Sequence, residues 1–276
     1  MTLTVGRISY LNAVPYFYRL AESGFAGRIV AGVPSELNRR LAAGEIDLSP
    51  SSSFEYARQW RDYRLLPGHS ISSIGPVRSV LLFSRLTLEE VAGQEIALTG
   101  ESATSVNLLQ ILLREFCGAP RVSCRVPDGP VEAVVAAGGS ALLIGDRALR
   151  AAGQLPAGGR VYDLGELWWR FTGLPFVFAL WIVREESYLA RREAILAFRH
   201  QLDDALRLAF ADLDNMAAAV APGSPLAPGE LAGYWRTAVS YRFTPAHLAG
   251  LRKFFALCVK HGLLAEEPEI RFVAEW

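Results

Sequence analysis

The sequence predicts an α/β protein with two lobes that enclose a ligand cleft. Short apolar segments alternate with helical patterns through most of the chain, which favours at least one largely parallel sheet. Two strongly apolar segments, residues 77–84 and 177–183, bracket a self-contained segment. A chain that leaves one lobe, builds a second and returns through a paired strand forms such a clamp. We therefore expect one lobe over residues 1–83 and 178–276 and a second lobe over residues 84–177.

The first lobe begins with an apolar strand over residues 3–8. Start and stop signals mark a helix over residues 34–44, because Pro34 lies at its start and Gly44 at its end. Residues 69–75 are rich in Ser and Gly and are expected to form a loop. The other elements expected up to residue 84 are a helix over 16–22, strands over 28–33, 46–50 and 77–84, and a helix from residue 54.

The middle of the chain continues the alternation, and the last third is helical. Between the two bracketing strands we expect helices over 88–93, 106–116, 131–137 and 147–152 and strands over 95–99 and 141–146. Residues 163–169 and 171–176 are dense in aromatic side chains, which line the cleft or pack between the lobes. After the strand over 177–183 we expect helices over 187–214, 227–240 and 244–262.

Four turns carry small polar side chains directly after expected strands. They are residues 9–12, residues 51–53, residues 100–105 and the pair Gly145-Asp146. Ligands of open α/β sheets bind beyond the carboxyl ends of the strands, and anions bind at helix N-termini. The four turns are therefore expected to face one cleft, with Asn12 pointing into it. The alternative is that these residues cap the helices that follow, as Ser, Thr, Asn and Asp readily do.

The composition excludes several classes of protein. Lys plus Arg and Asp plus Glu both number 28, so the net charge is zero and no basic field is present to hold nucleic acid. Residues 1–8 do not resemble a secretory signal, and no apolar run is long enough to span a bilayer. We expect a cytoplasmic protein with no membrane partner. Cys117, Cys124 and Cys258 lack CxxC spacing and are expected to be reduced and structural.

Several short motifs, taken together and in order, resemble the chorismate dehydratase family of the futalosine route to menaquinone. The resemblance runs from Gly6 to about Trp181 and is carried by residues 6–12 with Pro15, 33–38, 44–50, 75–80, 143–146 and 172–179. It implies a two-lobed fold like that of type II periplasmic solute-binding proteins. It also implies dehydration of chorismate to 3-[(1-carboxyvinyl)oxy]benzoate, which is 3-enolpyruvylbenzoate.

The resemblance implies site residues as well. Asn12 and Ser79 match the two positions that are central in the family, and they are the expected catalytic residues. The residues expected to bind substrate are Ser9, Tyr10, Ser51, Ser52, Arg78, Ser102, Ala103, Thr104, Ser105, Gly145, Asp146 and Phe176. Our hypothesis is that Asn12 and Ser79 hydrogen-bond the departing hydroxyl and an adjacent substrate oxygen. A carboxylate would be held at the helix N-terminus by Ser102, Thr104 and Ser105.

The expected chemistry needs no added group. Chorismate is a dianion one elimination short of an aromatic ring, so aromatisation supplies much of the driving force and positioning contributes the rest. The four histidines have no metal-ligand spacing, and the chain contains neither a P-loop nor a GxGxxG motif. We therefore expect no metal and no cofactor. The general base is unresolved at this stage, and the enolpyruvyl carboxylate of the substrate is one candidate.

Two other functions compete with this one. The first is 1,4-dihydroxy-6-naphthoate synthase of the same pathway and fold, although the intact turn over residues 9–12 favours the dehydratase. The second is a non-enzymatic solute-binding protein, and the missing secretory signal argues against a receptor for import. An oligomer is compatible with the sequence, which leaves three further points open: the resting position of the lobes, the kinetic constants, and whether Trp168, Trp169 and Phe176 contact substrate.

Overall fold

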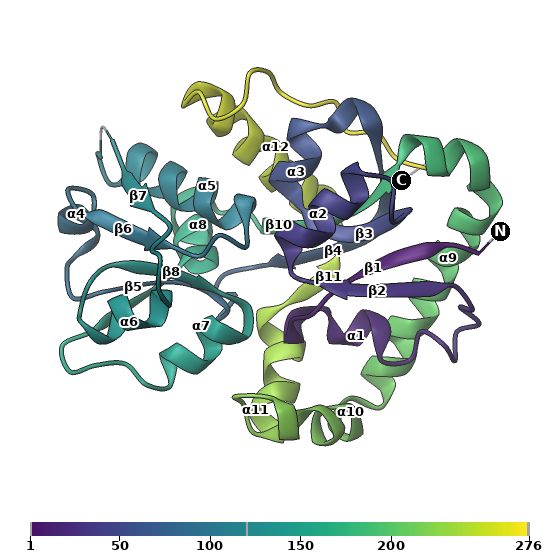
Figure 1. Ribbon diagram of the computed structural model, residues 1–276, viewed down its shortest axis with the longest axis horizontal. Coiled ribbons are helices and arrows are strands. Elements are labelled where there is room, and N and C mark those ends of the chain that lie inside the picture. Colours follow the sequence, from purple (N-terminus) through teal and green to yellow (C-terminus); the bar gives the residue numbers. More distant parts are fainter. Residues whose placement is uncertain (1, 120, 275–276) are drawn as a thin grey trace.

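The computed structural model describes residues 2–119 and 121–274, and its strands form two sheets (Figure 1). One sheet has six strands in the order β11-β4-β10-β3-β1-β2, and the other has five in the order β7-β6-β8-β5-β9. The six strands are β1 (Thr4–Ile8), β2 (Arg28–Gly32), β3 (Leu48–Ser52), β4 (Tyr63–Ser73), β10 (Phe176–Arg184) and β11 (Ser240–Arg242). The five are β5 (Val80–Ser84), β6 (Glu95–Leu98), β7 (Ser123–Arg125), β8 (Ala141–Ile144) and β9 (Arg160–Asp163).

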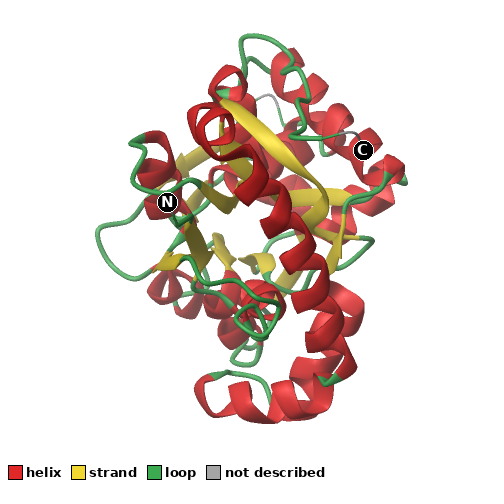
Figure 2. Cartoon of the chain, turned by 90° about the vertical axis from the view of Figure 1, so that its right-hand side faces the viewer, coloured by secondary structure: helices red, strands yellow, loops and turns green. Residues whose placement is uncertain are grey.

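Helices pack around both sheets. The longest helix, α9 (Glu185–Ala211), crosses in front of the strands in Figure 2. The six-stranded lobe carries α1 (Val14–Phe17), α2 (Pro34–Ala42), α3 (Ser53–Arg58), α9 (Glu185–Ala211), α10 (Leu213–Val220), α11 (Pro228–Gly233) and α12 (Pro245–Lys260). The five-stranded lobe carries α4 (Leu88–Val91), α5 (Ala103–Ile111), α6 (Val131–Ala136), α7 (Gly145–Ala152) and α8 (Leu164–Thr172). Short 3-10 turns are η1 (Leu11–Ala13), η2 (Trp60–Asp62) and η4 (Ala221–Gly223), and π-helical turns are η3 (Leu112–Phe116) and η5 (Tyr234–Ala238).

The chain crosses between the two sheets twice. It passes from β4 to β5 through residues 74–79 and returns from α8 to β10 through residues 173–175. Ser73 and Phe176 are paired across β4 and β10, so the first crossing starts beside the point where the second one ends. We propose the lobe boundaries at these crossings, because they are the points where a hinge would act.

The strand expected over residues 77–84 lies in the other lobe from the one we expected. This strand is β5, and it pairs with β8 and β9 of the five-stranded sheet. All five residues of β5 are buried, and an apolar strand of this kind fits either sheet equally well. Composition could therefore identify the strand but not the sheet to which it belongs.

Both sheets are mixed, but in the five-stranded sheet β6, β7, β8 and β9 run in the same direction and β5 opposes them, so the expectation of at least one largely parallel sheet is confirmed. β1 runs parallel to β2 and β3, but β10 runs antiparallel to β3 and to β4, and β11 runs antiparallel to β4. In the five-stranded sheet β6 is parallel to β7 and β8, whereas β5 is antiparallel to β8 and β9. The returning strand β10 inserts between β3 and β4, and this insertion produces two of the antiparallel pairs of the larger sheet, while β11 adds another at the edge.

The loop expected over residues 69–75 is wrong as well, because most of that stretch belongs to β4. Its serines suggested a turn, yet Ser70, Ser72 and Ser73 are buried strand residues, and the first two have hydrogen-bonded hydroxyls. Ser70 Oγ donates to the Arg242 carbonyl at 2.9 Å, and Ser72 Oγ donates to the Ser240 carbonyl at 3.0 Å. Polar side chains that bond to a neighbouring strand can be buried at little cost.

Five further parts of the structure differ from the expectation. The first helix is α1 and ends at Phe17, and the aromatic stretch after residue 163 forms α8. The helix expected over 227–240 consists of α11 followed by the π-helical η5. The short strands β7 and β9 were not expected, because neither has an apolar alternation that sequence reading could detect.

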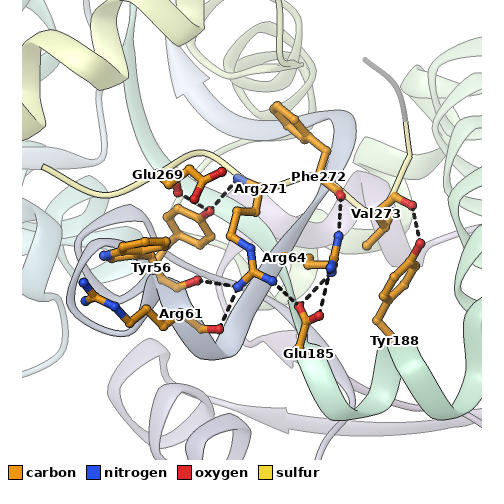
Figure 3. A network of polar contacts seen from close by, with 10 residues as sticks. Tyr56, Arg61, Arg64, Glu185, Tyr188, Glu269, Arg271, Phe272 and Val273 are labelled. Carbon is orange, nitrogen blue, oxygen red and sulfur yellow. Dashed lines mark hydrogen bonds and ion pairs between the residues drawn. The ribbon is translucent and has the colours of Figure 1, made fainter.

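Hydrogen bonds and ion pairs fix the C-terminal segment to the six-stranded lobe (Figure 3). Glu185 at the start of α9 accepts from Arg64 Nε at 2.7 Å and from Arg271 Nη2 at 3.0 Å. Tyr188 donates to the Val273 carbonyl at 2.9 Å. The two arginines also lower the pKa of the Glu185 carboxyl, so this carboxylate is stabilised in its charged form. No helix within the described residues is long and apolar enough to cross a membrane.

Candidate active site

The turn that follows β1 is held by hydrogen bonds to its backbone. The Leu11 N–H donates to Asp146 Oδ1 at 2.9 Å, and the Leu11 carbonyl accepts from Trp235 Nε1 at 2.7 Å. The Asn12 carbonyl accepts from the Tyr241 hydroxyl at 2.9 Å. Asp146 belongs to α7 of the other lobe, whereas Trp235 and Tyr241 come from the C-terminal part of the chain. Three distant parts of the sequence therefore fix the conformation of this turn.

The Asn12 side chain does not act as a helix cap. No side-chain hydrogen bond caps the start of η1 or of α1. Instead, Asn12 lines a cavity between the lobes, and its Oδ1 is buried with no hydrogen-bond partner within the described residues. A buried polar atom without a partner costs about 1–3 kcal/mol. The arrangement leaves this amide oxygen available to a ligand in the cavity.

A strained turn presents Ser79 to the same cavity. Arg78 has a φ of 63°, and it is the one non-glycine residue with positive φ within the described part of the chain. The Asp163 carboxylate accepts the N–H groups of Val77 at 3.1 Å and of Arg78 at 2.6 Å, so it holds the turn in this conformation. Burial raises the pKa of Asp163, and these N–H donors act in the opposite direction. Strain of this kind is concentrated at functional sites.

The Ser79 hydroxyl is buried and bonded to a second buried hydroxyl. Tyr234 lies 2.8 Å from Ser79 Oγ and donates to it, while the Val77 carbonyl lies at 3.4 Å and is a weak acceptor. Burial raises the pKa of Tyr234, which keeps its hydroxyl protonated. Because Ser79 accepts from Tyr234 and donates only the long bond to Val77, its proton can be transferred from Val77 to a hydrogen bond with a ligand. The Gly145 N–H donates a hydrogen bond to the Ser79 carbonyl oxygen, with an N–O distance of 2.7 Å.

The N-terminus of α5 contributes both to the cavity and to contact between the lobes. Ser102 caps the helix by accepting the Ser105 N–H at 3.2 Å, and both serines line the cavity. Thr104 Oγ1 lies 2.5 Å from Ser52 Oγ and accepts the Phe54 N–H at 3.1 Å. The Thr104 hydroxyl therefore joins the lobes in this structure, whereas we expected it to help hold a carboxylate.

Tyr10 joins the lobes at the mouth of the cleft. Its hydroxyl donates to Glu101, which also accepts from Arg147 Nη1 at 2.9 Å. The Tyr10 ring packs on Gly145, whose φ is +60° and where an added Cβ would lie 2.9 Å from ring atoms. Burial and the hydrogen bond to Glu101 raise the pKa of Tyr10, so the hydroxyl remains a donor. Glycine is required at this position by both the backbone and the contact.

The cavity has a volume of about 50 Å³. Both the six-stranded lobe and the five-stranded lobe contribute residues to its walls. Pockets that hold drug-sized ligands usually have about 300–1,000 Å³. The lobes are therefore closed in this structure, and a ring-sized ligand requires them to move apart. Of the expected site residues, the structure places the following in the lining: Tyr10, Asn12, Ser52, Ser79, Ser102, Ser105 and Gly145.

The other expected site residues lie outside the lining. Ser9 is exposed, Ser51 is buried in β3 with an unpaired Oγ, and Asp146 bonds to the turn after β1. Ala103 and Thr104 lie in the first turn of α5, and Arg78 faces a separate surface cleft that Glu166 and Arg150 also line. Phe176 packs against Trp168 and Phe254, and Trp168 is fully buried, so these rings build the core. Trp169 is 40% exposed.

Sequence reasoning missed the apolar part of the cavity. These lining residues are Ile8, Pro34, Ile71, Val77, Val80, Ile144, Phe178 and Ala179. Ile8 and Ile144 are the last residues of their strands, so the rule that ligands bind beyond strand ends could have found them. Three positions come from the neighbouring strands β4 and β10, whose pairing was not foreseen: Ile71, Phe178 and Ala179.

The cavity is lined by hydroxyl groups, one amide and apolar side chains. Within the described residues, none of the lining side chains is charged. Two carboxylates next to lining residues in the chain, Glu101 and Asp146, bond to the Tyr10 hydroxyl and to the Leu11 N–H respectively. Burial raises the pKa of Asp146. In the described part of the chain no group of three or more His, Cys, Asp or Glu side chains could hold a metal ion.

Solved structures with the same arrangement define the class of fold. A protein from Archaeoglobus fulgidus superposes with a TM-score of 0.72 at 18% identity, covering 95% of this chain and 98% of that chain. The periplasmic aliphatic sulphonate binding protein of Escherichia coli superposes with a TM-score of 0.68 at 17% identity, covering 100% of this chain and 92% of that chain. The chain thus has a periplasmic-binding-protein-like fold, with two α/β lobes and a cleft between them.

Sequence comparison identifies the family within that class. The chain belongs to the menaquinone biosynthesis family, whose model matches residues 3–260. A curated relative, chorismate dehydratase of Thermus thermophilus, is 41% identical over 197 residues, which cover 66% of this chain and 70% of the relative. The matched region of the family model includes both sheets and the turns at Asn12 and Ser79.

Proposed function

We propose that this chain dehydrates chorismate to 3-[(1-carboxyvinyl)oxy]benzoate, as a step of menaquinone biosynthesis by way of futalosine. The observation that carries the proposal is the buried, unpaired Asn12 amide oxygen in a cavity that also holds the Ser79 hydroxyl. The family membership and the 41% identical chorismate dehydratase support the choice of reaction. Chorismate is an anionic small molecule, and it is the partner that this function requires.

The reaction breaks two bonds on neighbouring ring carbons. The C–H bond of the carbon that bears the enolpyruvyl ether breaks, and its electron pair forms the third ring double bond. The C–O bond of the adjacent carbon breaks, and the departing hydroxyl takes up a proton and leaves as water. The ring becomes aromatic, so the protein has to orient the substrate and stabilise the leaving oxygen.

Ser79 and Asn12 are the two groups that suit this task. Tyr234 donates to the Ser79 oxygen, and the Ser79 proton makes only a long bond to the Val77 carbonyl, so Ser79 can donate to the departing hydroxyl instead. The Asn12 amide offers both an acceptor oxygen and two N–H donors on a turn that three other residues hold in place. Donors fixed in advance are effective because they need no reorganisation during the reaction.

Neutral donors would hold the two carboxylates of the substrate. Ser102 and Ser105 place hydroxyls at the N-terminus of α5, where the helix dipole favours negative charge. No Asp or Glu side chain is among the described lining residues that could accept the ring proton. We propose that the enolpyruvyl carboxylate of the substrate takes this proton, since it is attached through the ether to the same ring carbon.

Mass spectrometry of chorismate incubated with the purified protein tests this function. We expect a product lighter by one water, with the ultraviolet absorbance of a benzoate, formed without added metal or cofactor. Tight binding of chorismate without turnover would instead indicate a solute-binding protein. If chorismate is neither bound nor converted while cyclic dehypoxanthine futalosine yields 1,4-dihydroxy-6-naphthoate, the chain is the other enzyme of the pathway.

A further inference from the structure

A second, larger cavity lies in the six-stranded lobe, away from the cleft. Its volume is about 650 Å³, which is within the range of ligand pockets, and it shares no lining residue with the cavity at Asn12. The walls come from α9, from β4 and the residue that follows it, from the π-helical η5 and from β11. π-Helical turns are rare and occur frequently at functional sites.

The lining of this second cavity suits a flat apolar ring. Trp235 and Tyr241 are buried in its wall, and Phe210 packs edge-on against Tyr241 with ring centroids 5.6 Å apart. Ile74 is 55% exposed and Phe210 is 36% exposed, so two large apolar side chains meet solvent at the same cavity. His69 is only 3% exposed, and its Nδ1 has no hydrogen-bond partner within the described residues.

The charged groups of this cavity favour an anion. Arg207, Arg236 and Arg242 line it, and among the described residues the one acidic lining side chain is Asp203, which lies 3.3 Å from His69 Nε2. Arg207 pairs with Asp204 at 3.0 Å, and Arg236 lies 3.7 Å from Asp214, so both are partly neutralised. Arg242 is exposed and forms no ion pair with the described residues. Its guanidinium can bind a carboxylate through two parallel hydrogen bonds.

The wall of the second cavity is also the support of the turn at Asn12. Trp235 donates its Nε1–H to the Leu11 carbonyl, and Tyr241 donates its hydroxyl to the Asn12 carbonyl. A ligand in this cavity lies against the wall that contains these two buried side chains, which hold the candidate catalytic amide. A shift of Trp235 or of Tyr241 changes one of the hydrogen bonds that fix the turn.

We propose that this cavity is a second binding site, for a small aromatic carboxylate, and that its occupancy alters the activity of the cleft through Trp235 and Tyr241. The ring of the ligand packs between Phe210, Ile74 and the buried aromatic wall. The carboxylate pairs with Arg242, and the unpaired His69 nitrogen offers a further polar contact. Binding at this site does not depend on the proposed reaction, so the two claims can fail separately.

Calorimetric titration of the whole protein with 2-naphthoate tests the site. We expect 2-naphthoate to bind the wild type. Its dissociation constant should be at least tenfold larger for Arg242→Gln and for Phe210→Ser. The matched control is Arg252→Gln, an exposed arginine on α12, which should bind as the wild type does. Ser79→Ala should also bind 2-naphthoate unchanged, because Ser79 lines only the cleft.

Steady-state kinetics with chorismate test the coupling. We expect 2-naphthoate to change kcat of the wild type and of Arg252→Gln, and to have no effect on Arg242→Gln at the same concentration. Absence of 2-naphthoate binding to the wild type would overturn the site. Two other results would also overturn it. One is 2-naphthoate binding that is unchanged in Arg242→Gln and Phe210→Ser. The other is competitive displacement of 2-naphthoate by chorismate, because the ligand would then occupy the cleft.

Discussion

Replacement of Gly145 by alanine should impair closure of the cleft more than it impairs folding. Gly145 has a φ of +60°, and a Cβ there would lie 2.9 Å from Cδ2 and Cγ of the Tyr10 ring. Carbon atoms in favourable contact are about 3.5–4.0 Å apart. The ring cannot move freely out of the way, because the Tyr10 hydroxyl is bonded to Glu101 on the other lobe.

Two costs add at this position, and a second glycine separates them. The left-handed backbone costs an alanine about 1–2 kcal/mol. Forcing a methyl group into a packed contact typically costs a further 1–3 kcal/mol or so. Gly158 has a φ of +76° and nothing within 4 Å of an added Cβ, so Gly158→Ala carries the first cost alone. If separation of the lobes relieves the contact, the closed population falls about 5- to 150-fold.

The assay compares kcat/KM for chorismate with the free energy of unfolding in urea for both variants. We expect Gly145→Ala to lose activity in the range of that population change, and Gly158→Ala to lose stability but retain wild-type kcat/KM. Small-angle scattering should show a larger radius for Gly145→Ala in the presence of ligand. If Gly145→Ala retains activity within twofold of the wild type, the contact between Tyr10 and Gly145 is not part of the working site.

Two further predictions test other contacts, the first at Tyr234 and the second at Glu185. Tyr234→Phe removes the donor to Ser79 and should lower kcat about tenfold with little change in KM. Tyr188→Phe removes another buried tyrosine hydroxyl, which bonds to the Val273 carbonyl away from the cleft, and should keep kcat. Equal kcat values for the two variants would contradict the role of Tyr234. Arg64 holds the pKa of Glu185 below its ordinary value of 4.5, so this carboxylate contributes stability above that pH, and the contribution is lost as the pH falls through the lowered pKa. The stability difference between the wild type and Glu185→Gln should therefore shrink in urea unfolding below about pH 4.5, and a constant difference would contradict the ion pair.

The sequence was informative where local signals decide the structure. Pro34 and Gly44 correctly marked the helix that became α2, and the alternation of apolar segments located β1, β2, β5 and β8. These predictions held because capping and strand patterns depend on neighbouring residues. β4 was missed because the burial of its serines depends on β11, which lies far along the chain.

The residues of the candidate site also fall into two groups, those that the sequence could point to and those that it could not. Asn12, Ser102 and Gly145 could be singled out because they lie at the ends of expected strands, whereas Ser79 was singled out only by the family resemblance; the structure gathers all four in one cavity. The roles of Trp235 and Tyr241 could not be foreseen, since they support the turn at Asn12 from more than 200 residues away. Such contacts depend on the return of the C-terminal helices to the first strand.

Comparison of the wild type with Asn12→Ala on chorismate tests the central claim most directly. Calorimetry should show that both proteins bind chorismate, and mass spectrometry should show that only the wild type releases the product lighter by one water at an appreciable rate. We expect kcat to fall about 100- to 1,000-fold, as is common when one fixed hydrogen-bonding group is removed from an active site. Turnover by Asn12→Ala at the wild-type rate would contradict the account, because the turn after β1 would then not be the catalytic element.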